Sequence, residues 1–312
     1  MQHIASLQDI KLQDAWLTIG SFDGVHLGHR QILKELTAGA HAHGAPAVVL
    51  TFYPHPAVVL RGPRDSFYLS DPEEKAALLG ESGIDVVITQ PFDPQIAAIP
   101  AADFMLTLKD QLGLRQLWVG HDFALGRDRQ GDAAALQKMG MELDYAVHVI
   151  SPVQVNGEVI SSSLIRRLLL AGEMRRVAQF LGRPYRIPGS VVRGDGRGRT
   201  LGIPTANLAV WRERAVPGSG VYAVRAHIGA AAYGAVANIG VRPTFEKEPV
   251  APRLEAHLLD FDGEIYGQEI QLEFLERLRG EQRFSSAEEL VVQIETDIKK
   301  ARLLFAGENL RN

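Results

Sequence analysis

The chain has 312 residues, of which 46% are hydrophobic and 22% charged, and its formal net charge is −4. This length allows two domains, and the composition is typical of a globular protein. The acidic balance argues against a general binder of nucleic acid or anionic membranes, and the absence of cysteine excludes disulfides, iron–sulfur clusters and thiol catalysis. The N-terminus lacks the basic start and long apolar run of a signal peptide, so we expect a cytoplasmic enzyme.

Short apolar segments alternate with amphipathic helical patterns from residue 15 to residue 150. Strands are predicted at Leu17–Phe22, Ala47–Phe52, Asp85–Thr89, Gln116–Gly120 and Ala146–Ile150, and helices at 30–39, 72–82, 101–112 and 131–139. This alternation predicts an α/β domain with a doubly wound, Rossmann-like parallel sheet. Ligands of such sheets bind at the carboxyl ends of the strands, so the segments after the strands are the candidate sites.

The first strand leads into Gly20–His29, with the sequence GSFDGVHLGH, and then into a helix. A glycine-rich turn from strand to helix points backbone N–H groups and the helix dipole at one place, which favours a phosphate ligand. The spacing fits neither the dinucleotide fingerprint nor the P-loop. A metal site formed by Asp23, His26 and His29 and an ordinary turn with surface histidines remain alternatives. Nucleotidyl transfer fits best, because imidazole and helix-start N–H groups bind α-phosphate oxygens as charge develops.

Two further strand ends carry polar residues beside glycine or proline. In Thr51–Pro56 two prolines hold His55 near the edge of the sheet, as scaffold or as a binding residue. In Gly120–Arg127, Asp122 is a candidate for binding a hydroxyl group and Arg127 for binding a phosphate. The alternative for this second segment is an ordinary loop.

A serine-rich helix start follows the last of these strands. Ser161, Ser162 and Ser163 are predicted to cap a helix with an apolar face. Because a cap needs fewer hydroxyl groups, this start is also a candidate phosphate site, with Arg166 balancing the charge.

The alternation of strands and helices ends near residue 183, which places the domain boundary there, between domains 1–183 and 184–312. Strands without intervening helices are then predicted at Gly189–Arg193, Gly220–Ile228, Ala232–Ile239, Arg253–Leu259 and Glu269–Leu275. They indicate an antiparallel sheet or a small β-barrel. A terminal helix is predicted from Ser286 to Phe305, with Ser286 and Glu289 as a capping box.

The second half has its own glycine-rich segment, Gly194–Asn207. Four glycines in nine residues can wrap a phosphate chain. Its arginines raise RNA binding as an alternative, but interleaved aromatic residues are missing. Thr205 and Asn207 point to the same side of an extended segment, and their oxygens suit Mg²⁺ bound with a nucleotide.

A kinase that acts on an alcohol also needs a carboxylate near the reacting hydroxyl group. In the alternating segment Arg253–Leu258, Glu255 and His257 share the face opposite the apolar residues. Glu255 is therefore the candidate general base, and a solvated strand face is the alternative.

Together these segments resemble the bacterial bifunctional riboflavin kinase/FMN adenylyltransferase family, also called FAD synthetase. The matching segments occur in family order over nearly the whole chain: Gly20–His29, Thr51–Pro56, Gly120–Gly126, Ile160–Arg166, Leu181–Tyr185, Gly194–Asn207, Gly234–Phe245 and Glu255–Gly267. The resemblance implies that the C-terminal domain makes FMN from riboflavin and ATP with Mg²⁺. The N-terminal domain would then join FMN to AMP from a second ATP, giving FAD and pyrophosphate.

The resemblance also implies roles for single residues. His26 and His29 would stabilise the α-phosphate during transfer, Glu255 would be the general base, and Thr205 and Asn207 would bind Mg²⁺ with ATP. Flavin-pocket candidates are His55, Asp122 and Phe123. The residues expected to bind nucleotide or phosphate are Gly20, Phe22, Asp23, Gly24, Gly28, Ser161, Ser162, Ser163, Arg166, Gly194, Gly196, Gly198, Arg199 and Gly202.

Two positions depart from the family pattern, Leu125 in place of Phe and Ser163 in place of Thr. Neither removes a charged or metal-binding group, so we expect both activities. The alternatives are a single-activity nucleotidyltransferase with a regulatory barrel and a non-catalytic flavin-binding protein. The expected partners are riboflavin, FMN, FAD and ATP, without nucleic acid or membrane, and self-association stays open.

Overall fold

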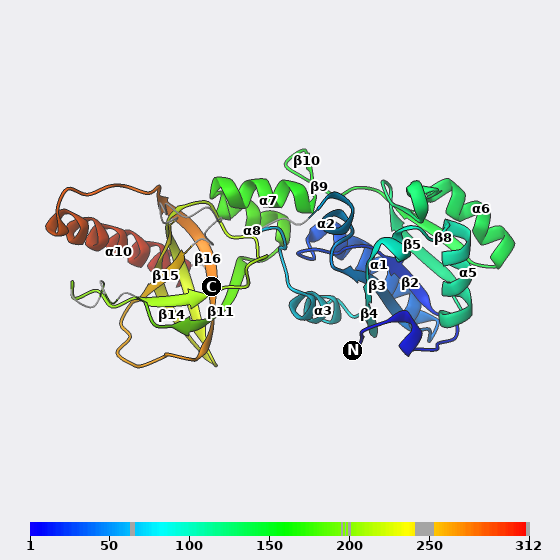
Figure 1. The fold of residues 1–312 in the computed structure, drawn as a ribbon, viewed down its shortest axis with the longest axis horizontal. Helices are drawn as coiled ribbons and strands as arrows, with labels where there is room; N and C mark the ends of the chain where they lie inside the picture. Colours follow the sequence, from blue (N-terminus) through cyan, green and yellow to red (C-terminus); the bar gives the residue numbers. More distant parts are fainter. Residues whose placement is uncertain (63–65, 195, 197, 199–200, 241–252, 310–312) are drawn as a thin grey trace. The chain divides into compact units, whose positions relative to one another are not determined.

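The computed structural model describes residues 1–62, 66–194, 196, 198, 201–240 and 253–309 (Figure 1). The chain forms two compact units. Unit 1 comprises Met1–Arg64 and Tyr68–Ser162, and unit 2 comprises Asp65–Phe67 and Ser163–Asn312. The boundary between the two units thus falls after Ser162, ahead of residue 183. The assignment of the two functions to domains 1–183 and 184–312 stays a prediction.

Unit 1 is built on a parallel sheet of six strands in the order β1-β4-β3-β2-β5-β8. The strands are β1 (Gln2–Ile4), β2 (Trp16–Ile19), β3 (Ala47–Tyr53), β4 (Val86–Pro91), β5 (Gln116–Gly120) and β8 (Ala146–Ile150). The five strands expected from the sequence are confirmed. The sequence pattern does not predict the edge strand β1, because three residues are too few to show a period.

Helices cover both faces of this sheet, which confirms the doubly wound arrangement. They are α1 (Leu27–Ala42), α2 (Pro56–Arg61), α3 (Pro72–Glu81), α4 (Pro94–Ala97), α5 (Ala101–Leu112) and α6 (Ala133–Leu143). Short pairs β6–β7 (Ala124–Leu125 with Gly131–Asp132) and β9–β10 (Gln154–Val155 with Glu158–Val159) and 3₁₀ turns at Leu7–Asp9 and Arg127–Arg129 complete the unit. Successive residues of β3 point into the hydrophobic cores on the two faces of the sheet. Leu50 clusters with Leu108 of α5, and Val49 clusters with Leu36 of α1.

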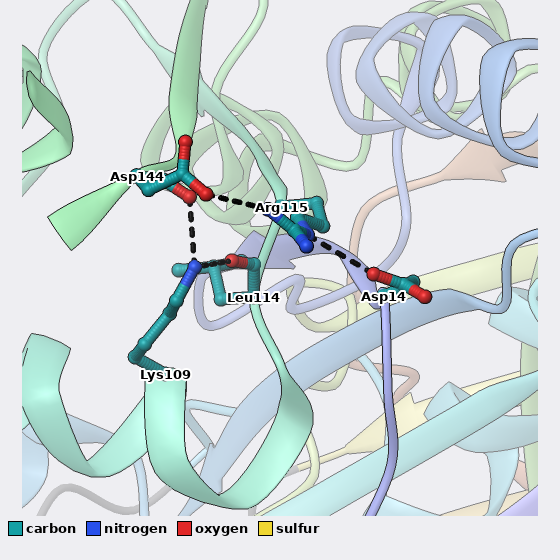
Figure 2. A network of polar contacts seen from close by, with 5 residues as sticks. All are labelled: Asp14, Lys109, Leu114, Arg115 and Asp144. Atoms are coloured by element: carbon teal, nitrogen blue, oxygen red, sulfur yellow. Dashed lines mark hydrogen bonds and ion pairs between the residues drawn. The ribbon is translucent and has the colours of Figure 1, made fainter.

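A polar network ties together the amino ends of three neighbouring strands (Figure 2). Arg115, which precedes β5, donates to Asp14 before β2 at 3.0 Å and to Asp144 before β8 at 2.5 Å. Lys109 of α5 donates through Nζ to the carbonyl oxygens of Leu114 and Asp144, at 3.1 and 2.8 Å. These contacts lie at the edge of the sheet opposite the carboxyl ends, so they serve the fold rather than the candidate sites.

Unit 2 contains a closed antiparallel barrel in the order β11-β12-β15-β14-β13-β16. Its elements are α7 (Ser162–Ala171, whose first residue belongs to unit 1), α8 (Met174–Leu181), β11 (Tyr185–Val192), β12 (Ala206–Ala209), β13 (Gly220–Ile228), β14 (Ala231–Gly240), β15 (Arg253–Leu258), β16 (Glu269–Arg279) and α10 (Ala287–Asn309). Helix α10 packs on the barrel, where its Ala301 clusters with Val221 and Val236. None of the helices in the described ranges has the length and hydrophobicity that a bilayer-spanning helix requires.

Candidate active sites

Two segments of unit 1 that contain candidate site residues follow neighbouring strands. Residues 20–26, here called loop 20–26, follow β2, and residues 121–126 follow β5, which pairs with β2 in parallel. The strand order reverses between β2 and β5, because β3 and β4 lie on one side and β8 on the other. At such a switch point a crevice opens at the carboxyl ends, where α/β proteins bind ligands. The predicted phosphate loop and the segment with Asp122 therefore lie where a ligand is expected.

The backbone of loop 20–26 is strained. Phe22, Gly24 and Val25 all have positive φ angles, of 48°, 78° and 39°. Glycine adopts this region freely, whereas a β-branched residue such as Val25 adopts it only when its surroundings impose it. The loop is therefore preformed by contacts with the rest of unit 1.

Asp23 makes several of these contacts. Its buried carboxylate accepts the N–H group of Leu69 at 2.9 and 3.1 Å and that of Ser70 at 3.2 Å. These hydrogen bonds use the carboxylate to stabilise the loop. They therefore argue against the alternative of a metal site formed by Asp23, His26 and His29. No cluster of three His, Cys, Asp or Glu placed to hold a metal occurs in the described ranges either. A role of Asp23 in nucleotide binding stays a prediction.

His26 and His29 form a stacked pair. His26 caps α1 and accepts the N–H group of His29 on Nδ1 at 3.3 Å, so the N–H group of the His26 ring lies on Nε2. The ring centroids are 3.6 Å apart and the planes differ by 16°. A Cβ at Gly28 would lie 3.1 Å from the His26 ring, so this glycine leaves room for the stack. A role of Gly28 in binding nucleotide or phosphate stays a prediction.

His29 is uncharged at neutral pH. Burial, followed by the charges of His26 and Lys75, lowers the pKa of His29 well below its ordinary value of 6.5. Its Nδ1 atom is buried and has no hydrogen-bond partner within the described residues. Such an atom is costly in a folded protein unless a ligand satisfies it. This observation supports a ligand-binding role for His29.

The lowered pKa predicts that unit 1 is sensitive to acid. The unfolded chain takes up a proton on His29 near pH 6.5, whereas the folded chain does not, so stability is lost as the pH falls below 6.5. As the pH falls, the free energy of unfolding is expected to decrease more steeply in the wild type than in His29→Gln. The two slopes are expected to differ by at most about 1.4 kcal/mol per pH unit. Urea unfolding between about pH 5 and 7.5 measures both slopes. A Trp211→Phe background leaves Trp16 and Trp118, both in unit 1, as reporters. Equal slopes would contradict the prediction.

Asp122 and Phe123 line one cavity of about 390 Å³ in unit 1. His121, Arg129 and Asp132 line it as well, and Arg129 donates to the Asp122 carbonyl at 3.0 Å. The volume is within the range of small-molecule sites. The structure thus brings together two of the three flavin-pocket candidates.

The third candidate, His55, caps a helix. Its Nδ1 accepts the N–H group of Ala57 at the start of α2, at 3.0 Å, and its own N–H donates to the Tyr68 hydroxyl at 2.9 Å. These contacts give His55 a scaffold role after β3. A role in flavin binding stays a prediction.

Among the predicted serines, Ser162 contacts loop 20–26, because its hydroxyl donates to the carbonyl oxygen of Asp23 at 2.9 Å. In unit 2, Arg166 donates through Nε to the carbonyl oxygen of Phe67 at 2.6 Å, and its guanidinium lies 3.9 Å from the Phe67 ring centroid. Binding of phosphate by the three serines and Arg166 stays a prediction.

A second cavity, of about 400 Å³, lies in unit 2 on the barrel face that α10 covers. Thr205, Asn207 and Glu255 all line it. Asn207 of β12 is directly opposite Glu255 of β15, which is in turn opposite Asn238 of β14. Opposite residues of neighbouring strands point to the same face. The barrel therefore gathers the predicted metal-binding pair and the predicted base at one place.

The alternation predicted for β15 is confirmed. Leu254, Ala256 and Leu258 are buried, whereas Glu255 and His257 face the cavity. Glu255 is thus part of a concave site and not of an open, solvated strand face.

The glycine-rich segment leaves room for the side chains of Thr205 and Asn207. A Cβ at Gly194 would lie 2.2 Å from Asn207 Nδ2, and one at Gly198 would lie 3.2 Å from Thr205 Oγ1. Asn207 Oδ1 is buried and accepts no hydrogen bond from the part of the chain that the structure describes. A carbonyl oxygen without a donor, together with a hydroxyl group, is a set of hard ligands that fits Mg²⁺.

The remaining residues predicted for this loop divide into two groups. Gly196 and Gly202 have φ angles of 70° and 74°, which glycine adopts without strain, and Gly196 lines the cavity. Arg199 lies outside the described residues.

Comparisons with known proteins identify the family of both halves of the chain. A family model described as FAD synthetase matches residues 8–164, and one described as riboflavin kinase matches residues 181–305. A bifunctional riboflavin kinase/FMN adenylyltransferase of Pseudomonas fluorescens is 40% identical over 93% of this chain and 92% of its own length. One from Escherichia coli K12 is 38% identical over 97% of this chain and 96% of its own. This chain belongs to the bifunctional riboflavin kinase/FMN adenylyltransferase family.

Membership in this family makes the chain a transferase with two activities, riboflavin kinase in its C-terminal half and FMN adenylyltransferase in its N-terminal half. A similar fold occurs in a crystal structure titled as a macrolide-efflux protein from Streptococcus pneumoniae. It has a TM-score of 0.87 and 30% identity and covers 96% of this chain and 98% of that chain.

One residue that lines the cavity of the riboflavin kinase half, Asp297, is not among the residues predicted from the sequence. Asp297 of α10 lines it, is 1% exposed, and accepts from Arg279 Nε at 2.8 Å and from Gln293 at 3.0 Å. One signal was present in the sequence: Asp297 is an acid on the apolar stripe of the terminal helix, between Ile294 and Ile298. A buried charge at such a position requires a partner, which Arg279 provides.

Proposed function

We propose that the cavity of unit 2 is the riboflavin kinase site. The observation that carries this proposal is the convergence of Thr205, Asn207 and Glu255 on one cavity. Glu255 removes the proton of the ribityl hydroxyl group. The oxygen of that hydroxyl group attacks the γ-phosphate of ATP, giving FMN and ADP. Arg253, whose Nε lies 3.3 Å from Glu255 Oε1, orients this carboxylate. Thr205 and Asn207 hold Mg²⁺ with ATP, and the metal supplies neutralisation of the phosphate charge.

We further propose that loop 20–26 and the start of α1 form the FMN adenylyltransferase site. A phosphate oxygen of FMN attacks the α-phosphate of a second ATP, FAD forms and pyrophosphate leaves. The imidazole N–H groups of His26 and His29 donate to the α-phosphate oxygens, where negative charge increases in the transition state. Asp122 and Phe123 belong to the flavin pocket. In this proposal the partners are riboflavin, FMN, FAD and ATP, the reactions are cytoplasmic, and neither nucleic acid nor membrane takes part.

The test is to incubate the pure protein with riboflavin, ATP and Mg²⁺ and to separate the flavins by chromatography. The proposal expects riboflavin to disappear through FMN to FAD. Conversion of added FMN to FAD without any use of riboflavin would instead show a single-activity nucleotidyltransferase with a regulatory barrel. Flavins that remain unchanged would show a flavin-binding protein without catalysis.

Asn207→Ala is expected to raise the Mg²⁺ concentration needed for half-maximal FMN formation by about tenfold or more. The reason is that the substitution removes the buried carbonyl oxygen assigned to the metal. Titration of EDTA-treated protein with MgCl₂ measures this value for riboflavin phosphorylation. The Mg²⁺ dependence of FMN-to-FAD conversion by the same chain is the control, and an unchanged dependence of both reactions would contradict the metal assignment.

A further inference from the structure

Unit 1 contains a buried lysine that neither the motifs nor the proposed chemistry uses. Lys75 of α3 is 6% exposed. Its Nζ donates to Thr51 Oγ1 at 2.9 Å, to the carbonyl oxygen of Ser21 at 3.2 Å and to that of Phe52 at 3.3 Å. The Thr51 hydroxyl donates to the same Ser21 carbonyl at 3.0 Å. One ammonium group thus joins the end of β3 to the beginning of loop 20–26.

The start of α3 holds this loop at further points. Asp71 caps the helix by accepting the N–H group of Glu74 at 2.7 Å, as the sequence predicts. Just before that cap, the Ser70 hydroxyl accepts the N–H group of Gly24 at 3.1 Å. Ser70 also donates its own N–H to Asp23, as described above. The segment from Leu69 to Lys75 therefore holds the loop at Ser21, Asp23 and Gly24, the last of which has a positive φ angle.

Charge links Lys75 to the histidine pair. Burial lowers the pKa of Lys75 to about 8, against the opposing effect of Asp23, so the side chain is mostly protonated at neutral pH. The charge of Lys75 is in turn one of the causes that lower the pKa of His29. His26, His29 and Asp23 are the titratable groups that these couplings involve.

We propose that Lys75 is a positioning residue for adenylyl transfer. By holding Ser21 and Thr51 it keeps loop 20–26, and with it the stacked His26 and His29 rings at the start of α1, in the arrangement that the transition state requires. The proposal rests on the function proposed for unit 1. A lysine of this kind contributes to kcat without touching either substrate, because misplacement of reacting groups by a fraction of an ångström slows the chemical step more than it weakens binding.

The test compares Lys75→Met with Lys109→Met. Lys109 is a matched control, since its Nζ also holds two backbone carbonyls in unit 1, but at the amino ends of the strands (Figure 2). For Lys75→Met, kcat of FMN-to-FAD conversion is expected to fall by about ten- to a hundredfold, with KM for ATP and FMN close to wild type. Lys109→Met is expected to keep both constants. Each variant is assayed at a temperature where tryptophan fluorescence shows unit 1 folded, with FMN formation by the same chain as the measure of enzyme concentration.

A wild-type kcat in folded Lys75→Met, or a rise in KM without a fall in kcat, would overturn the positioning role. If Lys75→Met does not fold, Thr51→Val takes its place, because it removes the hydroxyl between Lys75 and Ser21 at nearly constant volume. A lower kcat at unchanged KM is then expected, and an unchanged kcat overturns the proposal. A wild-type protein that makes no FAD from FMN would refute the proposed function of unit 1 instead.

Discussion

Glu255→Ala is expected to lower the rate of FMN formation from riboflavin by about 10²- to 10⁴-fold, the range that loss of a general base produces. Glu255 faces the cavity beside Asn207 and Asn238, so an alanine there leaves no carboxylate on that part of β15 to accept the ribityl proton. Conversion of FMN to FAD by the same protein is expected to keep the wild-type rate, because loop 20–26 and the start of α1, which form the proposed site of that reaction, belong to unit 1. Separate assays started with riboflavin and with FMN, read by chromatography, measure the two rates.

Two further variants sharpen this experiment. Glu255→Gln keeps the volume and hydrogen-bonding shape of the side chain but is not a base, so it is expected to lose as much activity as the alanine variant. Glu264→Ala removes an exposed acid of unit 2 that does not line the cavity, and it is expected to behave as the wild type. A Glu255→Gln protein with the wild-type rate would contradict the base assignment. Loss of both reactions in folded Glu255→Ala would contradict the assignment of two sites.

His29→Ala is expected to impair the other reaction. FMN-to-FAD conversion becomes about 10²- to 10³-fold slower, as when one donor to a developing negative charge is removed. The substitution deletes the ring that stacks on His26, together with a buried nitrogen that has no hydrogen-bond partner among the described residues. FMN formation in unit 2 is expected to be unchanged, so riboflavin is converted to FMN, which accumulates. A time course of the three flavins measures both effects in one reaction.

His41→Ala is the matched control for this prediction. His41 lies on the same helix, α1, but near its other end, where it is exposed and pairs with Asp85 at 3.0 Å. An exposed pair of this kind contributes little to stability, so the control is expected to form FAD at the wild-type rate. Equal loss of FAD formation in both variants would mean that α1 itself, and not the His29 ring, is required.

In unit 1 the sequence predicts where the strands and candidate loops lie better than it predicts which side chains contact one another. The strand–helix alternation gives the parallel sheet, and the rule for its carboxyl ends gives the place of loop 20–26 and of Asp122. The sequence does not show that Asp23 is engaged with Leu69 and Ser70, because these residues are separated by more than forty positions and share no pattern. Lys75 is missed for the same reason. Its sequence context is an ordinary first turn of a helix, and only folding brings it to Ser21 and Thr51.

In unit 2 the period of the strands predicts an antiparallel structure, and the alternation in β15 predicts which side Glu255 faces. Closure of the barrel and the pairing of β12 with β15 do not follow from these local patterns. The register of two strands depends on which apolar faces meet in the core, and a slip of one residue would turn Asn207 to the other face. The convergence of Asn207 and Glu255 is therefore a result of tertiary packing.

By itself the sequence determined the class of each half, the candidate phosphate loops and the chemistry available in them, because local periodicity, glycine spacing and side-chain type are properties of short segments. Only the tertiary structure decided which of these segments share a site and what holds them in place. Strand order puts loop 20–26 beside the segment that follows β5, and barrel register puts Glu255 opposite Asn207. Helix α3 brings Lys75 into contact with Ser21 at the beginning of loop 20–26. These are contacts between residues far apart in the chain, and they are fixed by burial of apolar surface that no single segment can complete alone.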